Sequence, residues 1–438
     1  MTSMKRFLSK LVPQYLKNYY HLAHAVAANL WYGFPAHRTV SSEAGKPARK
    51  LQVIGVTGTN GKTTTSQFIA KILETAGKKT ALASTINFQI GDEKWVNTSK
   101  FTTMSSWKLQ KFLSDAVKAK CEYAVLETSS HALDQNRVWG IPYVLAVLTN
   151  VTREHLDYHG TIDRYRAAKC KLFHMAKEGV VNMDMEDPLY FCGDQETKKK
   201  RIMLYSTKNS QAGVLAEDIT LDFKGTEFTV DGVRFRLRVP GLFNIENALA
   251  AISAARFLSI DLSVAKTALE SVPLIPGRME LVPNPMNADI VIDYAVTPDA
   301  FEKLYASILP LKIPGTKIIH VFGACGERDR GKRSMMGEIA SGYADIVILT
   351  NEDPYYENAE QIIDDIEKGV TKKKNRDYFR IFDRREAIHK ALSLTEIGDI
   401  VLITGKGAEQ TMAIGRERLP WSERKVIEEE LKKIEDKG

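Results

Sequence analysis

Residues 51–72, LQVIGVTGTNGKTTTSQFIAKI, combine the residue types that phosphate chemistry requires. The segment predicts a buried strand, a glycine-rich turn and the start of a helix. Gly58 and Gly61 let backbone N–H groups close on phosphate oxygens. Lys62 would reach the terminal phosphates, and the Thr63 hydroxyl would ligate Mg²⁺. The spacing differs from G-x-x-x-x-G-K-[ST] in one position, where the first glycine is missing. The strand, the lysine and the threonines are nevertheless in place, so we predict a binding site for a nucleotide triphosphate. The alternative is a turn that binds nothing.

Two later apolar strands, YAVLE and YVLAVLTN, end in polar residues at Glu127 and Asn150. Ligands of open α/β sheets gather at the carboxyl ends of the strands, so we expect both side chains near the phosphate loop. We interpret Glu127 as a metal ligand and His155, in the loop after the second strand, as another. A solvated carboxylate and a hydrogen-bonded histidine are the alternatives. Lys169 lies on a predicted helix over 162–176. Three interpretations are open for it: a phosphate-binding cation, a carbamylated lysine, or a cation exposed to solvent. The neighbouring residues do not decide among them.

Composition narrows the class of protein. The chain has 438 residues, 44% hydrophobic and 26% charged, which suits a soluble protein of about three domains. The net charge of +7 is spread without arginine-rich runs, which favours phosphate ligands over nucleic acid. The few cysteines are too dispersed for a zinc site or a disulfide framework, which indicates reduced thiols and the cytoplasm: Cys121, Cys170, Cys192 and Cys325.

The N-terminal segment, residues 1–50, is basic and helical in pattern. Its first 42 residues contain no acidic residue, and its cations are Lys5, Arg6, Lys10, Lys17 and Arg38. Apolar residues recur at i+4 along one stripe, at Phe7, Leu11, Tyr15 and Tyr19. The segment is too polar to span a membrane and lacks a secretory signal. We favour two interpretations of residues 5–34 equally: peripheral contact with the inner face of an anionic membrane, and packing on the next domain. Residues 39–50 are predicted to be a linker.

The remaining chain alternates strands and helices, which predicts an α/β protein. We predict a central ATP-binding domain over 51–277 with a parallel sheet covered on both faces. Within it, 200–238 is predicted to be an exposed β-meander. Breaks near Pro276 and Gly277 place a domain boundary, after which 278–438 forms a Rossmann-like, doubly wound domain.

The ordered loops resemble those of one family, the ATP-dependent Mur ligases of cell-wall peptide synthesis, which also includes folylpolyglutamate synthetase and the ligase half of cyanophycin synthetase. Within the family the motifs are most similar to those of UDP-N-acetylmuramoyl-tripeptide synthetases, which add the third amino acid of the stem peptide. The resemblance covers residues 51–420 and rests on TGTNGKTTT, ETSSHALDQNRV, LTNVTREHLDYHG, YRAAK, FNIENALAA, PGRME, DYAVTPDA, FGACGERDRGKR and GKGAE.

The resemblance implies that a substrate carboxylate attacks the γ-phosphate of ATP and that an amine then displaces phosphate from the acyl phosphate. It implies one Mg²⁺ at Thr63, a second at Glu127 and His155, and a carbamylated Lys169. The residues that it implies to be catalytic are Lys62, Lys169, Glu127 and His155. The ATP contacts that it implies are Gly58, Thr59, Asn60, Gly61, Lys62, Thr63, Thr64, Asn247, Arg278 and Asp293.

The resemblance also implies two substrate sites. The muramyl-peptide acceptor would contact Thr102, Thr103, Ser129, Gln135 and Arg137. The incoming amino acid would contact Arg328, Glu352, Asp353, Tyr355, Gly405 and Glu409. The family's D-N-P-R motif, whose arginine grips the distal carboxylate of diaminopimelate, ends here in Tyr355. Because two carboxylates would instead suit an amino group, we expect L-lysine or a similar diamino acid over diaminopimelate.

Other departures leave alternatives. The family's uridine-binding domain is longer than the roughly 50 residues before the phosphate loop, so a lipid-linked acceptor stands beside a nucleotide-sugar acceptor. Val296 and Ala408 replace histidines of family motifs, and we expect activity to survive both. A folylpolyglutamate-type ligase, a non-catalytic ATP-binding scaffold and a simple kinase are the competing functions. We expect a monomer that does not bind nucleic acid.

Overall fold

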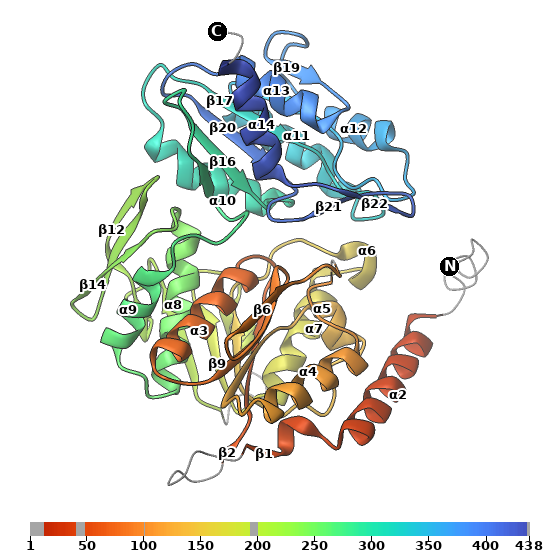
Figure 1. Ribbon diagram of the computed structural model, residues 1–438, viewed down its shortest axis with the longest axis vertical. Coiled ribbons are helices and arrows are strands. Elements are labelled where there is room, and N and C mark those ends of the chain that lie inside the picture. Colours follow the sequence, from red (N-terminus) through yellow and green to blue (C-terminus); the bar gives the residue numbers. More distant parts are fainter. Residues whose placement is uncertain (1–12, 41–48, 100, 193–199, 436–438) are drawn as a thin grey trace.

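The computed structural model describes residues 13–40, 49–99, 101–192 and 200–435. The chain forms a lower lobe and an upper lobe, each built on a twisted sheet with helices on both faces (Figure 1). The predicted bounds 1–50, 51–277 and 278–438 stay predictions, although the upper sheet begins with β15 at Glu280.

The lower sheet has the strand order β11-β10-β9-β8-β3-β7-β4-β5-β6. All neighbours from β11 to β4 are parallel, and β5 and β6 continue the edge as antiparallel strands. In chain order the strands are β3 (Gln52–Thr57), β4 (Thr80–Ala83), β5 (Asn87–Ile90), β6 (Glu93–Val96), β7 (Tyr123–Glu127), β8 (Tyr143–Leu148), β9 (Glu178–Asn182), β10 (Ile202–Ser206) and β11 (Val214–Leu215). Because β7 and β8 flank β3, their carboxyl ends lie on either side of the phosphate loop.

Buried apolar residues divide the lower lobe into two layers of core. Successive strand residues point to opposite faces, so Ile54 and Val56 join one core while Val53 joins the other. The first core is covered by α3 (Lys62–Thr75), α8 (Leu242–Phe257) and α9 (Leu262–Ser271). The second is covered by α4 (Ser106–Lys118), α5 (Ser130–Asp134) and α7 (Ile162–Met175).

The region predicted to be an exposed meander is divided and partly buried. Its first strand, β10, joins the large sheet instead. The meander proper comprises β12 (Glu217–Asp222), β13 (Gly225–Val230) and β14 (Val233–Leu237). Phe228 and Phe235 stack at 5.1 Å and are fully buried in the first core. The prediction of exposure was wrong because the alternating pattern supplies one apolar face, and that face packs against the lobe.

The upper sheet has the order β15-β16-β20-β17-β18-β19, and only the β15–β16 pair is antiparallel within it. Its strands are β15 (Glu280–Val282), β16 (Asp289–Asp293), β17 (Ile318–Phe322), β18 (Ile346–Leu349), β19 (Tyr378–Arg380) and β20 (Ile400–Thr404). One face carries α10 (Pro298–Ile308), α11 (Gly331–Tyr343) and α12 (Ala359–Glu367), and the other carries α13 (Arg384–Ser393) and α14 (Glu423–Glu435). A hairpin of β21 (Thr411–Ile414) and β22 (Glu417–Pro420) follows β20. Both lobes agree with the predicted α/β fold class.

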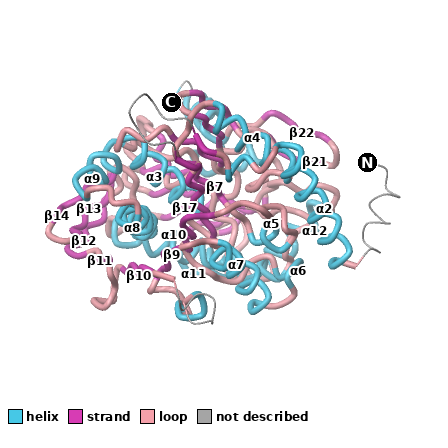
Figure 2. Tube along the Cα trace, turned by 90° about the horizontal axis from the view of Figure 1, so that it is seen from below, coloured by secondary structure: helices cyan, strands magenta, loops and turns pink. Residues whose placement is uncertain are grey.

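The N-terminal segment contains α2 (Gln14–Tyr32), the short helix Pro35–His37 and a hairpin of β1 (Thr39–Val40) with β2 (Arg49–Lys50). In both views α2 lies on the flank of the lower lobe opposite α9 (Figures 1 and 2). The predicted membrane contact at residues 5–12 and most of the predicted linker, 41–48, lie outside the described residues. Among the helices that the structure describes, none is long and apolar enough to cross a membrane.

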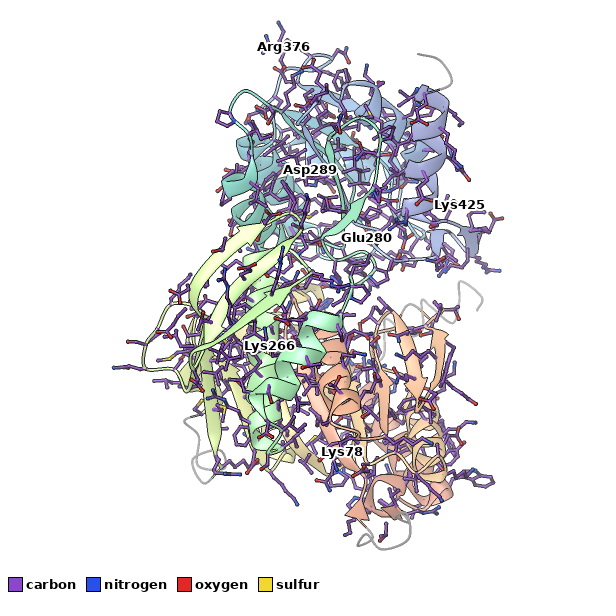
Figure 3. All side chains as sticks on the ribbon, turned by 60° about the vertical axis from the view of Figure 1, so that its left-hand side comes forward. Lys78, Lys266, Glu280, Asp289, Arg376 and Lys425 are labelled. Carbon is purple, nitrogen blue, oxygen red and sulfur yellow. The ribbon has the colours of Figure 1, made fainter. Side chains whose placement is uncertain are left out.

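The two lobes meet over the phosphate loop. The Asn60 side-chain amide donates to Asp299 Oδ2 at 2.8 Å, and the Lys332 ammonium lies 3.1 Å from Glu154 Oε1. Figure 3 labels Glu280 at the level where the two lobes adjoin, and Arg424 of α14 pairs with it at 2.6 Å. The carboxyl ends of the strands of both sheets therefore face one interlobe region.

Candidate active site

The phosphate loop is shaped by two glycines that no other residue can replace. A Cβ on Gly58 (φ 155°) would lie 1.8 Å from Thr149 Oγ1, and one on Gly61 (φ 82°) would lie 2.2 Å from Asn247 Oδ1. Lys62, at the start of α3, folds back and donates to the Gly58 and Thr59 carbonyl oxygens at 3.0 and 2.8 Å. The loop thus places a cation over its own backbone, where terminal phosphates would bind.

Asn150, which follows β8, supports the loop. Its backbone oxygen accepts from the Thr59 N–H, and its side-chain oxygen accepts from the Asn60 N–H, both at 2.9 Å. The expected position beside the loop is therefore correct. The hydrogen bond from the Asn60 N–H to this side-chain oxygen holds the backbone of the loop in place.

Lys169 faces the phosphate loop. The sequence alone had not decided whether this side chain points to the site or to solvent. Its side chain is fully buried on α7, its ammonium donates to Gly58 O at 2.7 Å, and it lies 4.3 Å from the centre of the Tyr165 ring. Burial, followed by the positive charge of Lys62, holds the pKa of Lys169 well below its ordinary value. A neutral amine at this position can act as a nucleophile.

Glu127 ends β7 and is 1% exposed. Its two carboxylate oxygens accept from the Thr85 hydroxyl at 2.6 Å and from the Thr85 N–H at 3.1 Å. Burial lowers the pKa of Lys62, and the negative charge of Glu127 opposes part of that shift, so the two groups share one electrostatic environment. The carboxylate is held in place by neutral donors and retains lone pairs for a cation.

His155 occupies a left-handed backbone position, φ 57°, directly before the short helix α6 (Leu156–His159). Its ring lies 4.7 Å from His131 and 6.2 Å from Tyr165. Burial, with the charges of His131, Lys169 and Lys62, lowers the pKa of His155 far below its ordinary value. The neutral ring therefore keeps a lone pair for a metal ion.

Sequence reasoning missed His131, which lies between His155 and His159 of the following loop. The His131 ring lies 5.4 Å from that of His159, which also bonds to the Ser130 hydroxyl at 3.0 Å. Burial lowers the pKa of His131 to about 3 and that of His159 to about 4. The signal was the position of His131 four residues after the end of β7, in S-S-H-A-L-D.

A metal ion here would depend on few protein ligands. Among the described residues no group of three or more histidine, cysteine, aspartate or glutamate side chains is arranged to hold one. Mg²⁺ usually keeps several waters and takes one or two carboxylates together with substrate phosphates. Glu127, His155 and the Thr63 hydroxyl therefore fit Mg²⁺ better than a metal that needs a cage of protein ligands.

The predicted acceptor residues gather beside Glu127. The Thr103 hydroxyl donates to Glu127 O at 2.9 Å and accepts from the Ser129 N–H at 2.9 Å. Arg137 donates to Thr103 O at 2.8 Å, while its buried Nε has no partner among the described residues. The Thr102 hydroxyl lies 3.3 Å from that of Thr85, whose own proton is donated to Glu127. The orphaned guanidinium donor suits an anionic group of a substrate.

Gln135 directly follows α5, the helix that begins after Ser129 of this cluster. Burial lowers the pKa of Arg137. The structure thus brings together the predicted acceptor residues on α5, its flanks and the loop before α4.

A cleft between the lobes receives the predicted ATP contacts. It is lined by residues of the phosphate loop, α8 and the first strands of the upper lobe, among them Asn60, Gly61, Thr64, Asn247, Arg278 and Asp293. The Arg278 guanidinium stacks 4.6 Å from the Tyr294 ring centre and reaches Thr63 Oγ1 at 3.4 Å. Asp293 accepts from the Met279 and Ala295 N–H groups, both at 2.8 Å, so its carboxylate also fixes the wall of the cleft.

The upper lobe presents Glu352 in the loop after β18. One of its oxygens accepts from the Cys325 thiol at 3.0 Å, and the other, Oε2, is buried without a partner among the described residues. A Cβ on Gly405 would lie 2.5 Å from Oε2, so glycine keeps the approach open. Burial raises the pKa of Glu352. An unpaired buried carboxylate oxygen is costly and favours a cationic ligand.

Asp353 differs from its neighbour. Its Oδ1 accepts from the Lys406 ammonium at 2.9 Å and from the Ala413 N–H at 2.7 Å. Lys406 also forms an ion pair with Glu409, which lies in the same loop after β20. Asp353 therefore holds the upper-lobe loops together, while the substrate contacts predicted for Glu352 and Asp353 stay predictions.

Tyr355 stands in the left-handed region, φ 52°, with two guanidinium groups near its ring. The Arg328 Cζ lies 5.9 Å and the Arg418 Cζ 5.4 Å from the ring centre. Arg418, on β22, is a residue that sequence reasoning missed, since nothing in the chain order links that hairpin to Tyr355.

The site combines a glycine loop with the half-buried Lys62 and the buried Lys169. A carboxylate and a histidine follow the adjoining strands, and the second sheet closes the cleft. These features define a class, the ATP-dependent enzymes that activate a substrate by transferring the γ-phosphoryl group.

Comparison with known proteins gives the family. Residues 56–255 match the Mur ligase middle domain, and residues 277–407 match the Mur ligase, glutamate ligase domain. The UDP-N-acetylmuramyl-tripeptide synthetase of Roseiflexus sp. (strain RS-1) is 40% identical over 401 residues, which cover 86% of this chain and 78% of that one. The UDP-N-acetylmuramoyl-L-alanyl-D-glutamate–2,6-diaminopimelate ligase of Caldanaerobacter subterraneus subsp. tengcongensis is 40% identical over 394 residues, covering 89% and 80%.

A solved structure agrees with these relatives. That of a UDP-N-acetylmuramoyl-L-alanyl-D-glutamate–2,6-diaminopimelate ligase is 32% identical, with a TM-score of 0.60, and covers 88% of this chain and 79% of that one. The chain belongs to the Mur ligase family and is an ATP-dependent ligase. Ligases of this family use ATP and Mg²⁺. The predicted family is confirmed, and the folylpolyglutamate-type and scaffold alternatives are not favoured.

Proposed function

We propose that this ligase joins a diamino acid, L-lysine in preference to diaminopimelate, to a muramoyl-L-Ala-D-Glu acceptor through an acyl phosphate. The acceptor type follows the names of the relatives. The observation that carries the choice of amino acid is Glu352, whose Oε2 is buried without a partner among the described residues, together with Tyr355 in place of an arginine. Glu352 thus brings a carboxylate to this site for an ammonium group, and Arg328 and Arg418, which lie near the Tyr355 ring, leave a cationic partner for the α-carboxylate of the amino acid.

The first step is attack of the acceptor carboxylate on the γ-phosphorus of ATP. A carboxylate oxygen–phosphorus bond forms, the bond from the γ-phosphorus to the β,γ-bridging oxygen breaks, and ADP leaves. Lys62 releases the Gly58 and Thr59 carbonyl oxygens and turns its charge to the γ-phosphate. Arg278 and Asn247, from opposite walls of the cleft, hold the nucleotide.

Thr63, Glu127 and His155 are the residues that would hold Mg²⁺, a first ion at Thr63 and a second at the other two. When bound, Mg²⁺ neutralises charge on the phosphate oxygens. Glu127 is fixed by the two bonds from Thr85, and the neutral His155 ring supplies a lone pair. These observations support the assignment of the ligands.

Lys169 is proposed to act as a carbamate. Its neutral amine attacks carbon dioxide. A nitrogen–carbon bond forms, one carbon–oxygen π bond becomes a lone pair on oxygen, and one proton leaves the nitrogen, so the neutral amine becomes an anion. The lowered pKa of Lys169 and its 2.7 Å contact with Gly58 O support this, because the loop holds Lys62 as a second cation on the same oxygen. The carbamate would pair with the Mg²⁺ held beside it.

The second step is displacement of phosphate from the acyl phosphate by the α-amine of the incoming amino acid. The amide nitrogen–carbon bond forms, the bond from carbon to the bridging oxygen breaks, and phosphate and one proton leave. Glu352 Oε2 accepts the distal ammonium of the amino acid, and Arg328 attracts its α-carboxylate. Asp353 stays bonded to Lys406 throughout.

An amino-acid panel tests the proposal. The full-length protein is incubated with ATP, Mg²⁺ and either UDP-linked or lipid-linked muramoyl-L-Ala-D-Glu, and ADP release and product mass are measured for each amino acid. We expect L-lysine to give the highest kcat/KM, and we expect Lys62→Ala to abolish acceptor-dependent ADP release. A strong preference for diaminopimelate would refute the choice of amino acid. A phosphorylated acceptor as the final product would refute the ligase mechanism.

A further inference from the structure

The helix α2 is inverted relative to an ordinary surface helix. Its outward stripe, at i+3 and i+4 spacing over four turns, consists entirely of apolar and aromatic side chains: Tyr15, Leu16, Tyr19, Tyr20, Ala23, Ala27, Leu30 and Trp31. The larger of these are between 46% and 77% exposed. In a surface helix of a globular protein the apolar stripe faces the core and the polar side faces water.

The polar residues of α2 face the protein. Gln14 donates to the Tyr158 hydroxyl at 2.9 Å, Asn18 donates to Asp134 Oδ2 at 3.1 Å, and Asn29 donates to Trp139 O at 2.9 Å. These bonds are spaced along the whole helix, so they fix its rotation about its own axis. The apolar stripe therefore points away from the lobe as a consequence of specific contacts.

The stripe continues at the C-terminal end of α2. The Trp31 ring, 77% exposed, lies 6.4 Å from that of Trp107, which is itself 36% exposed on α4. A contiguous exposed surface of this kind costs hydration free energy unless another apolar phase covers it.

Charge and side-chain type indicate what covers it. The first 42 residues contain no acidic residue, and their described part carries Lys17, half-buried on α2, and the exposed Arg38 beyond its C-terminal end. Tyrosine and tryptophan favour the interface between headgroups and acyl chains, and basic residues are attracted to anionic lipid. A protein partner would need a matching acidic groove, whereas an anionic bilayer supplies both the apolar phase and the negative charge.

We propose that α2 docks this ligase onto the surface of an anionic lipid bilayer, with the stripe from Tyr15 to Trp31 lying in the interface. The same contacts place the acceptor side of the active site beside the docked helix. Tyr158, which accepts from Gln14, donates to Asp134 Oδ2 at 2.9 Å, and Asp134 is the last residue of α5, directly before Gln135. An acceptor held at the bilayer surface would thus have a short path to the site.

Vesicle flotation of the full-length protein tests the proposal. The probes are phosphatidylcholine vesicles with and without about a third phosphatidylglycerol. We expect the protein to float with the anionic vesicles, and the double variant Tyr20→Ser, Trp31→Ser to lose at least about tenfold in apparent affinity. Ile397→Ser is the matched control, since Ile397 is also 77% exposed but lies in the upper lobe. Melting curves of the variants check that the fold is kept.

A second measurement, of tryptophan fluorescence, uses the protein with its stripe unchanged. Brominated lipid should quench part of the tryptophan fluorescence of the unmodified protein, and Trp31→Phe should remove that part. The proposal is overturned if the protein stays unbound to anionic vesicles, if the double variant floats like the unmodified protein, or if the stripe proves to mediate a dimer without lipid binding. Flotation requires neither ATP nor acceptor, so its failure would leave the proposed ligase function standing.

Discussion

At the scale of single residues, the active site is organised by one carbonyl oxygen. Gly58 O accepts from the half-buried Lys62 at 3.0 Å and from the buried Lys169 at 2.7 Å. Two ammonium groups on one oxygen repel each other in a medium of low dielectric, so one of them must lose its proton or find an anion. ATP supplies the anion for Lys62, and carbamylation would turn Lys169 into an anion itself.

Replacing Lys169 tests that interpretation. Lys169→Ala should lower kcat for ADP release at least about a hundredfold, because a charged group at the reacting phosphate is lost. If the working group is a carbamate, added short carboxylates should restore part of the rate. Steady-state assays with and without these acids give the answer, and full activity of the variant would contradict it.

The amino-acid pocket yields a second prediction at this scale. Tyr355→Arg should raise kcat/KM for diaminopimelate about tenfold or more and lower it for L-lysine, because a guanidinium would then meet the distal carboxylate and repel an ammonium. Competition assays with both amino acids measure the ratio. Ile397→Ser, on the far surface of the same lobe, serves as the control, and an unchanged ratio would show that Tyr355 does not face the amino acid.

Much of the site could be predicted at this scale because strand ends converge. Glu127 and Asn150 follow apolar runs, and the order β8-β3-β7 places both beside the loop. That Asp353 is bonded to Lys406 and Ala413 while Glu352 keeps an unpartnered oxygen among the described residues could not be predicted. Lys406 and Ala413 lie more than 50 residues away, and only the folded upper lobe reveals their contacts.

At the scale of elements, buried ion pairs join the helices of the upper lobe. The fully buried Arg333 side chain of α11 bonds to Glu357, before α12, and to Asp365 within α12. Hydrogen bonding to Arg333 lowers the pKa of Glu357 to about 2. Because the folded-state pKa lies below the unfolded value, this carboxylate stabilises the fold above its unfolded pKa, and the contribution is lost as the pH falls toward 2.

Glu357→Gln should therefore lower the free energy of unfolding of the upper lobe by about 3 kcal/mol at pH 7. The difference from the unmodified protein should shrink as the pH falls from 5 toward 2. Urea unfolding at several pH values measures it. A difference that is independent of pH would mean that the glutamate stabilises by packing alone.

The elements also show where pattern reasoning ends. The i+4 periodicity correctly predicts a helix around Tyr15 and Tyr19, but periodicity does not state which side faces inward. That choice is made by Tyr158, Asp134 and Trp139, which accept from the polar side of α2. The β-meander was predicted as exposed for the same reason, since one apolar face fits either an edge or a core.

At the scale of the whole molecule, the reaction requires both lobes. Arg278 of the upper lobe reaches Thr63 of the phosphate loop at 3.4 Å, and the Lys332–Glu154 pair at 3.1 Å crosses the junction beside His155. Both side chains of that pair are at most 10% exposed. The lobes are thus held in the arrangement in which ATP would be enclosed.

Lys332→Gln should loosen this closure, because it leaves Glu154 buried without its partner. We expect kcat/KM for ATP to fall about tenfold to a hundredfold, and small-angle scattering to show a larger radius of gyration with a bound ATP analogue than in the unmodified protein. Unchanged kinetics and scattering would show that the pair does not contribute to closure.

The central claim is that an acid is activated by phosphoryl transfer and captured by an amine. Mass spectrometry of a reaction with oxygen-18 in the acceptor carboxylate tests it most directly. The account predicts one labelled oxygen in the released phosphate and a product that equals acceptor plus amino acid minus water. Unlabelled phosphate, or a product without the amino acid, would contradict it.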